Sequence, residues 1–283
     1  MKHIFRIAAI LVLAISLTSA AIGAPEENNR IYFEKAFTAR DLKNTYDEEN
    51  AVELKLNDTT AECSSSAVKV TGRNIVISDE GTYVISGTLS NGSIIVNAGK
   101  DDKVQLVLDN ADISCQDSAA ICILTADKVF LTLKEGTENS LSNGGFFIET
   151  EENTIDAVLM SKEDLTINGT GSLSITAPKK NAVTCKDTLR VTSGKLNITA
   201  EKHGFSVNDA IYITSAEISI KAGKDGLHCK KTGDPNTGCI YLQSGNISID
   251  AADDAVSAMY YYVEDICKLN VINGEMNIGE KEE

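Results

Sequence analysis

The chain of 283 residues contains no tryptophan, and aromatic residues make up only 5% of it. Serine, threonine, asparagine, isoleucine and valine are plentiful instead. This composition favours strands and turns over helices. The length is sufficient to bury a substantial core, in one large domain or in two smaller ones.

Positive charge is also scarce. Lysine and arginine number 26 against 41 aspartates and glutamates, which gives a formal net charge of −15. A surface of this kind repels nucleic acid and anionic lipid, so we expect no nucleic-acid partner and no membrane partner. It attracts cations, or it must recruit them before it meets another polyanion.

Several catalytic and metal-binding patterns are missing. The seven cysteines show no CxxC spacing, which argues against a zinc site. Export would permit disulfides, but we interpret most of these cysteines as small apolar fillers of a core. Serine-nucleophile and P-loop motifs are absent. The only histidines are too few to predict a conventional site: His3, His203 and His228.

A long apolar run occurs only at the amino terminus. Ile7 to Leu17 follow Lys2 and Arg6 and meet the small residues Ser19 to Ala21. This layout predicts a signal peptide over residues 1–21, because the run is shorter than the roughly 20 residues of a spanning helix. We therefore expect a secreted, extracellular protein. Residues 22–65 are charged and weakly patterned, and we interpret them as a mobile leader or amino-terminal cap.

A repeat occupies the second half of the chain. Small residues open successive copies at Ala182, Gly204 and Gly226, each 22 residues after the last. Each copy holds three apolar pairs spaced i, i+2, which is strand periodicity with one face inward. In the copy that begins at His203 these pairs are Phe205/Val207, Ile211/Ile213 and Ile218/Ile220.

Three short strands in each coil of about 22 residues predict an all-β fold, a parallel β-helix over residues 66–283. A β-sandwich would need hairpins and antiparallel register, which the constant period argues against. Earlier pairs extend the rows, with Ile121/Ile123 and Val158/Met160 in the first. In the last coil we place Leu269/Val271 in the second row and Met276/Ile278 in the third.

Stacked coils bring acidic positions into columns about 5 Å apart. One column holds Asp156, Asn181, His203, Asp225 and Asp254, with Asp253 beside the last; a second holds Asp127, Glu163, Asp187 and Asp209. Like charges at that spacing repel one another, so a cation is needed to offset them.

Calcium suits these columns, because it takes six to eight oxygen ligands and is plentiful outside cells. We predict Asp225, Asp253 and Asp254 as ligands, followed by Asp187 and Asp209. Glycine after the aspartate would let the backbone turn tightly. The alternative is that these are ordinary corner residues with solubilising carboxylates.

The chain resembles the calcium-binding, right-handed parallel β-helix proteins that bind acidic sugars and cellulose and are similar in fold to polysaccharide lyases. The resemblance covers roughly residues 70–278 and is carried by GTYVISGTL (81–89), VLDNADI (107–113), LTLKEGTENSLSNG (131–144), MSKEDLTINGTGSLSIT (160–176) and the Asp-Gly coils. It implies carbohydrate binding and a calcium cofactor. The chain departs from the family's repeated Asp-Gly at Asn181-Ala182, His203-Gly204 and Asp254-Ala255.

Two inserts at one corner of the late coils predict a sugar site. The first carries Lys230 and Lys231, and the second carries Tyr260, Tyr261 and Tyr262. Tyrosine rings can stack on pyranose faces while lysine binds a uronate carboxylate and calcium bridges protein to ligand. Alternatively, the tyrosines cover a coil end and the lysines keep a loop soluble.

These observations predict a secreted, monomeric, calcium-dependent protein that binds plant cell-wall polysaccharide, either acidic sugars such as polygalacturonate or cellulose. The enzymatic alternative is a calcium-dependent pectate-type lyase, with Lys202, Lys224 or Lys230 as the base. We favour binding over catalysis. A third alternative is a non-catalytic surface adhesin or structural solenoid.

Overall fold

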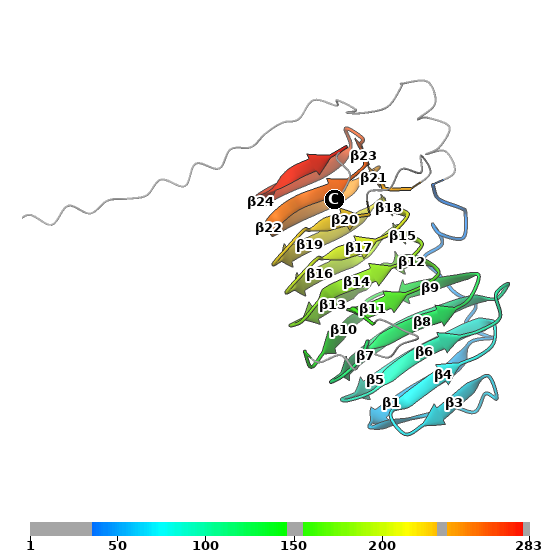
Figure 1. The fold of residues 1–283 in the computed structure, drawn as a ribbon. Coiled ribbons are helices and arrows are strands. Elements are labelled where there is room, and N and C mark those ends of the chain that lie inside the picture. Colours follow the sequence, from blue (N-terminus) through cyan, green and yellow to red (C-terminus); the bar gives the residue numbers. More distant parts are fainter. Residues whose placement is uncertain (1–35, 146–154, 231–236, 280–283) are drawn as a thin grey trace, which may run out of the picture.

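The described residues of the computed structural model, 36–145, 155–230 and 237–279, form an all-β solenoid (Figure 1). Its coils stack from the cyan and blue strands at the amino-terminal end to the red strands at the carboxyl-terminal end. Strands one coil apart pair in parallel, so the predicted β-helix is confirmed. The predicted signal peptide lies outside the described residues, which contain no helix long and apolar enough to span a membrane.

Each coil contributes one strand to each of three parallel faces, because its three alternating segments point alternate side chains into one shared core. The first face contains β4 (Asn74–Ile77), β6 (Ser93–Asn97), β8 (Ile121–Thr125), β11 (Ala157–Ser161), β14 (Asn181–Cys185), β17 (Phe205–Val207), β20 (Leu227–Cys229) and the second half of β22 (Gly245–Ala258).

The second face contains the first parts of β1 (Val52–Asp58), β5 (Gly81–Leu89) and β7 (Lys103–Cys115), then β9 (Lys128–Leu133), β12 (Asp164–Gly169), β15 (Thr188–Val191), β18 (Ala210–Ile213), β21 (Cys239–Leu242) and β23 (Tyr260–Val263). The third face contains the ends of β1, β5 and β7, then β10 (Glu138–Asn143), β13 (Ser172–Ala177), β16 (Lys195–Ala200), β19 (Ala216–Ala222), the first half of β22 and the first half of β24 (Cys267–Ile278).

The amino-terminal end carries the only antiparallel pairings among the described strands. There β2 (Thr60–Glu62) pairs with β1, and β3 (Val68–Thr71) pairs with β4. Because β1 already pairs in parallel with β5, the stack begins at Val52, earlier than the predicted boundary at residue 66.

The predicted register needs correction in two coils. Leu159 and Ser161, not Val158 and Met160, stand in line with the inward pair Ile121/Ile123. A shift of one residue in a strand moves each side chain to the opposite face, and Met160 accordingly packs in a small separate cluster with Ala119 and Cys122.

The last coil also differs from the prediction. Leu269 and Val271 pair with Ile247 and Ile249 on the third face, and Met276 and Ile278 begin the next pass on the first face. The second-face strand of this coil is β23, which contains the tyrosines that the sequence predicts to lie in an insert.

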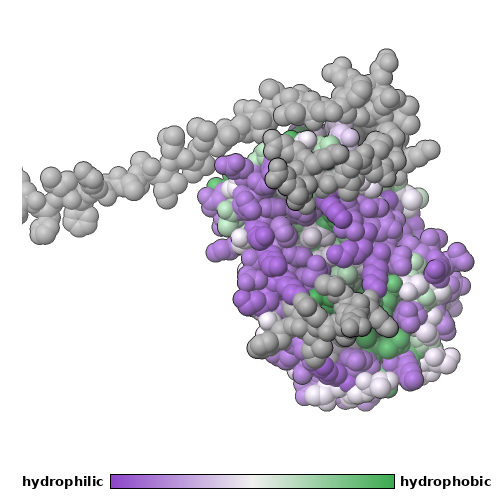
Figure 2. Space-filling view, viewed as in Figure 1, coloured by the Kyte–Doolittle hydropathy of each residue, from purple (hydrophilic) through white to green (hydrophobic). Residues whose placement is uncertain are grey.

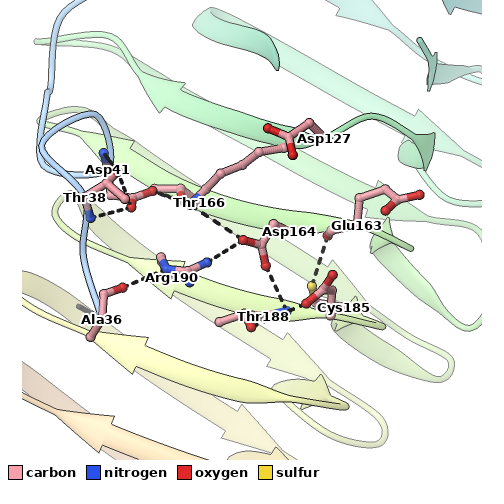
Figure 3. Close-up of polar contacts among 12 residues, drawn as sticks. Ala36, Thr38, Asp41, Asp127, Glu163, Asp164, Thr166, Cys185, Thr188 and Arg190 are labelled. Carbon is pink, nitrogen blue, oxygen red and sulfur yellow. Dashed lines mark hydrogen bonds and ion pairs between the residues drawn. The ribbon is translucent and has the colours of Figure 1, made fainter. Parts of the chain in front are cut away.

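A segment that we call the strap, residues 36–45, crosses the outer side of the second face (Figure 3). Its Asp41 is fully buried and bonds to Lys128 and Thr166, while the carbonyl of Ala36 accepts a hydrogen bond from Arg190. The guanidinium of Arg40 lies 4.3 Å from the centre of the Phe130 ring. This part of the chain is therefore packed against the solenoid rather than a mobile leader.

All seven cysteines carry free thiols, and those at positions 185 and 229 lie in the main core. This agrees with their interpretation as apolar fillers. The view in Figure 2 shows a largely hydrophilic surface over the middle coils, as the strong net negative charge leads one to expect.

Candidate functional site

The corner between the third and first faces carries a ladder of hydrogen bonds from coil to coil. The amide of His203 donates to Oδ1 of Asn181 at 3.2 Å, and the amide of Asp225 donates to Nδ1 of His203 at 3.3 Å. The amide of Asp254 then donates to Oδ1 of Asp225 at 3.2 Å. We call these four residues the corner ladder. Each backbone N–H turned along the stack needs an acceptor, which explains why this column holds only side chains that can accept.

Asp225 is the centre of this corner. Its side chain is only 7% exposed, and its Oδ2 lies 2.8 Å from Nδ1 of His228 and 3.3 Å from Nδ1 of His203. The two imidazole rings are 4.6 Å apart between centroids. Burial by itself would raise the pKa of the Asp225 carboxyl, but the imidazole of His203 beside it and the hydrogen bond with His228 outweigh burial and hold that pKa well below its ordinary value. The carboxylate is therefore ionised at any physiological pH.

Asp253 and Asp254 bring two more carboxylates to Asp225. One oxygen from each of the three lies within 4.8 Å of the others, so a single cation could touch all three. The backbone places them there, because the amide of Asp253 donates to the carbonyl of Lys224 and that of Gly226 donates to the carbonyl of Asp254. Asp253 is exposed and Asp254 is half-buried. We call Asp225, Asp253 and Asp254 the acidic cluster.

Gly226 follows Asp225 for a reason other than the predicted tight turn. A Cβ atom at Gly226 would lie 2.4 Å from Cγ2 of Ile249 and 2.8 Å from the carbonyl oxygen of Ala255. The glycine is therefore required by the close approach of the next coil rather than by an unusual backbone angle. This approach keeps Asp225 and Asp254 in adjacent coils and so keeps the cluster together.

A groove of about 1030 Å³ runs along the same corner beside the last coils. Polar side chains from both sides of the corner line it: Thr199, Lys221, Asp250, Asp253, Asp254, Asn273 and Glu275. Nδ2 of Asn273 donates to Oδ1 of Asp250 at 2.7 Å across one wall. We call this feature the acidic groove. Two members of the acidic cluster stand at its edge, so a cation held there would be open to a ligand in the groove.

A column of lysines adjoins the corner ladder. The amide of Lys202 donates to the carbonyl of Lys180, and the amide of Lys224 donates to the carbonyl of Lys202. Asp253 takes the next place in this column. Lys202 and Lys224 are both exposed. The backbone of these lysines therefore adjoins the acidic cluster, on the coils that precede it.

Asp187 and Asp209, the other two predicted ligands, lie at a different corner. They stand in adjacent coils between the first and second faces, with the amide of Asp209 3.3 Å from the carbonyl of Asp187. The short first-face strands separate them from Asp225, and neither belongs to a group in which three possible ligands converge among the described residues. The five predicted aspartates therefore do not surround a single ion.

The second corner nevertheless shows the predicted crowding of charge. Burial, together with the neighbouring charges of Asp164 and Asp209, raises the pKa of Asp187 to about 6. Asp164 in turn binds Arg190 at 2.9 Å (Figure 3).

The predicted sugar site does not assemble as expected. Lys230 is exposed just after β20, at the second corner, and Lys231 lies outside the described residues. The tyrosines form strand β23 rather than a loop, with Tyr261 packed against the core. Tyr260 and Tyr262 alternate with Tyr261 and so point to the opposite side of the strand. The three rings cannot share one sugar.

Sequence reasoning missed part of this corner. His203 and His228 are 25 residues apart in the sequence and occupy different positions of the repeat, one at the corner and one within a first-face strand. Stacking of the coils nevertheless brings both to one carboxylate. The sequence analysis did not predict that two of the three histidines would both contact Asp225. Asp250, Lys221 and Glu275 gave no motif signal, and only their place beside the Asp253-Asp254 pair could have suggested them.

Together the fold and the corner describe a β-solenoid that presents clustered carboxylates along an open groove. The family described as "Carbohydrate-binding domain-containing protein" matches residues 71–283, and the chain belongs to this family. A relative of the same description from Acetivibrio thermocellus is 33% identical over 205 residues, which are 72% of each chain.

A solved structure is similar over most of the solenoid. It is described as the polysaccharide lyase-like protein from C. thermocellum, as a gadolinium derivative. The TM-score is 0.71 at 29% identity, and the match covers 81% of this chain and 97% of the other.

Proposed function

We propose that this member of the carbohydrate-binding family is a secreted protein that binds plant cell-wall polysaccharide with the help of calcium. The preferred ligand is an acidic polysaccharide such as polygalacturonate, and cellulose is the neutral alternative. The observation that carries the proposal is the convergence of Asp225, Asp253 and Asp254 at the edge of the acidic groove.

The donor set of the acidic cluster fits calcium. Calcium is a hard cation that takes oxygen ligands in flexible geometry, and the cluster offers three carboxylates whose oxygens lie within 4.8 Å of one another. The ion would be held by these three residues and would supply positive charge at the edge of the groove. The remaining coordination positions would face the open side, where water or sugar oxygens can enter.

An acidic sugar fits this corner better than a neutral one. A bare acidic groove repels a polyanion, so binding of a uronate requires a cation between the two. Lys202 and Lys224 are exposed on the coils that precede the cluster, and their ammonium groups can bind further carboxylates along a chain. Because the lysines repeat with the coil spacing of about 5 Å, they favour an extended, repeating ligand.

The test is a binding measurement with purified protein on polygalacturonate and on cellulose, each with calcium and with a chelator. We expect polygalacturonate to bind with calcium and to be released by the chelator. Asp253→Asn should weaken calcium-dependent binding by about tenfold or more, since ligand charge sets calcium affinity. Asp187→Asn, at the other corner, is the matched control and should bind normally. Equal binding with and without calcium by all three proteins would contradict the proposal.

A second candidate is a calcium-dependent lyase, favoured by the exposed lysines beside the acidic cluster and by the description of the structural neighbour as polysaccharide lyase-like. Here calcium would acidify the proton next to the uronate carboxylate, and Lys202 or Lys224 would remove it. Incubation with polygalacturonate and calcium tests this, because elimination creates an unsaturated product that absorbs in the ultraviolet. Product formation that disappears in Lys224→Met would establish the lyase. Binding without product would leave the binding function.

A further inference from the structure

The imidazoles of His203 and His228 both lie against the carboxylate of Asp225. Nδ1 of His228 and Nδ1 of His203 both lie within 3.3 Å of Oδ2 of Asp225. The three ligand atoms lie within 4.8 Å of one another, and all three side chains are less than one fifth exposed. This group is distinct from the acidic cluster, with which it shares only Asp225.

Stacking of the coils creates this arrangement. His203 belongs to the corner ladder one coil before Asp225. His228 lies on β20, where it stands in register with Ser206 of the preceding coil and Ser257 of the next, so its side chain is directed out of the core. The backbone of two neighbouring coils therefore fixes the Cα positions of both histidines, and their Nδ1 atoms are directed at one oxygen.

The donor atoms differ in kind from those of the acidic cluster. Imidazole nitrogen suits zinc, copper, nickel and iron, whereas calcium and magnesium prefer oxygen. Zinc bound tetrahedrally at about 2.0 to 2.1 Å places neighbouring ligand atoms about 3.3 Å apart. The distance of 3.3 Å between Nδ1 of His203 and Oδ2 of Asp225 already matches this ligand–ligand distance. The distance of 2.8 Å between Nδ1 of His228 and the same oxygen would need a small side-chain movement.

We propose that His203, Asp225 and His228 bind a divalent transition-metal ion, represented by Zn²⁺, through two Nδ1 atoms and Oδ2. Nδ1 of His203 also accepts the amide of Asp225 at 3.3 Å, so a bound ion would replace that hydrogen bond. Three protein ligands leave a fourth position for water or for an oxygen of a bound molecule. Asp225 joins this site to the acidic cluster, because Oδ2 faces the histidines while Oδ1 accepts the amide of Asp254. The proposal goes beyond the proposed function and does not depend on it.

The test is Zn²⁺ binding to the full chain, freed of metal by a chelator and measured by titration calorimetry. His203→Asn is the informative variant. Asparagine occupies the equivalent place at position 181, where its Oδ1 accepts the amide of the next coil, so the corner ladder is kept while the imidazole is lost. His228→Gln removes the other imidazole outside the ladder, and it serves if His203→Asn melts at a lower temperature than the wild type.

We expect one Zn²⁺ per wild-type chain, with affinity reduced by at least about tenfold in either histidine variant. Asp253→Asn should keep Zn²⁺ binding, whereas its calcium affinity falls. With Co²⁺ as a spectroscopic probe, visible bands without intense thiolate absorption would distinguish this site from the cysteines.

Wild-type protein that binds no Zn²⁺, or Zn²⁺ affinity in both histidine variants equal to that of the wild type, would overturn the proposal. The histidines would then serve only as hydrogen-bond partners of Asp225. That result would leave calcium-dependent polysaccharide binding intact, just as normal Zn²⁺ binding without polysaccharide binding would count against the proposed function alone.

Discussion

Nζ of Lys128 lies 2.7 Å from Oδ1 of Asp41, and the carboxylate is completely buried between the strap and the outer side of the second face. Burial alone would raise the pKa of Asp41, but the bonds from Lys128, Thr166 and Thr38 outweigh it and lower the pKa to about 2. This ion pair fastens the strap to the solenoid. It connects a segment before the first coil to strands in the middle of the stack.

The Asp41→Asn substitution should destabilise the protein by about 3 kcal/mol, because it leaves the largely buried charge of Lys128 with only the more distant carboxylate of Asp164, 3.8 Å away. Chemical denaturation at pH 7 measures this. A carboxyl whose pKa is lower in the folded than in the unfolded state stabilises the fold at pH values above its unfolded pKa. The difference in unfolding free energy between the wild type and the variant should therefore shrink as pH falls from about 4 toward 2. Asp47→Asn, on an exposed residue, is the control and should change little. A pH-independent difference would contradict the role of the charge.

The Asp187→Asn substitution should stabilise the protein at neutral pH by about 1 kcal/mol. The folded pKa of about 6 is raised, so folding stability is fully present below the unfolded pKa and declines as pH rises from about 4 to 6. Removing the charge removes that decline. Unfolding free energies at pH 4 and pH 7 test this, and Asp209→Asn should lower the pKa of Asp187 in an NMR titration. An unfolding free energy at pH 7 equal to that of the wild type would show that a cation or solvent already relieves the repulsion between the carboxylates.

The Gly226→Ala substitution should cost about 1 to 3 kcal/mol, because the new methyl group would overlap Ile249 and the carbonyl of Ala255. It should also weaken calcium binding, since the shift separates Asp225 from Asp254. Ala182→Gly at the equivalent corner is the matched control and should cost less than about 1 kcal/mol. Thermal unfolding in the presence of a chelator compares the two. Similar melting temperatures would show that the corner can adjust without strain.

Calcium should raise the melting temperature of the wild type relative to chelator. At a concentration one hundred times the dissociation constant, the gain is about 2.7 kcal/mol. Asp225→Ala and Asp254→Ala should remove most of this shift, whereas Asp187→Ala should retain it because it lies at the other corner. A shift that survives in the first two variants would place the calcium elsewhere.

Strand periodicity in the sequence was sufficient to predict the solenoid. The alternating pairs of residues 205–220 recur every coil, and equivalent residues must face inward for the coils to share one core. Where the pattern was ambiguous, the prediction was wrong: Val158/Met160 and Leu159/Ser161 both alternate, and only the pairing with β8 selects the second.

The site was less predictable, because function at this corner depends on neighbours in other coils. Asp225, Asp253 and Asp254 were correctly expected to lie together, since Asp225 and the Asp253-Asp254 pair occupy one position of the repeat in successive coils. Asp187 and Asp209 do form a column, but the first-face strands separate it from the corner that holds Asp225. The tyrosine run carried no signal that distinguished a loop from strand β23.

The sequence alone therefore determined that the chain coils into stacked strands with carboxylates in columns, because local alternation and period dictate which side chains face inward. Tertiary structure decided which columns share a corner, that two distant histidines meet Asp225, and that the strap is fastened by Asp41. These contacts join residues in different coils, so they depend on the geometry of each turn and on the register between strands, which no local pattern encodes.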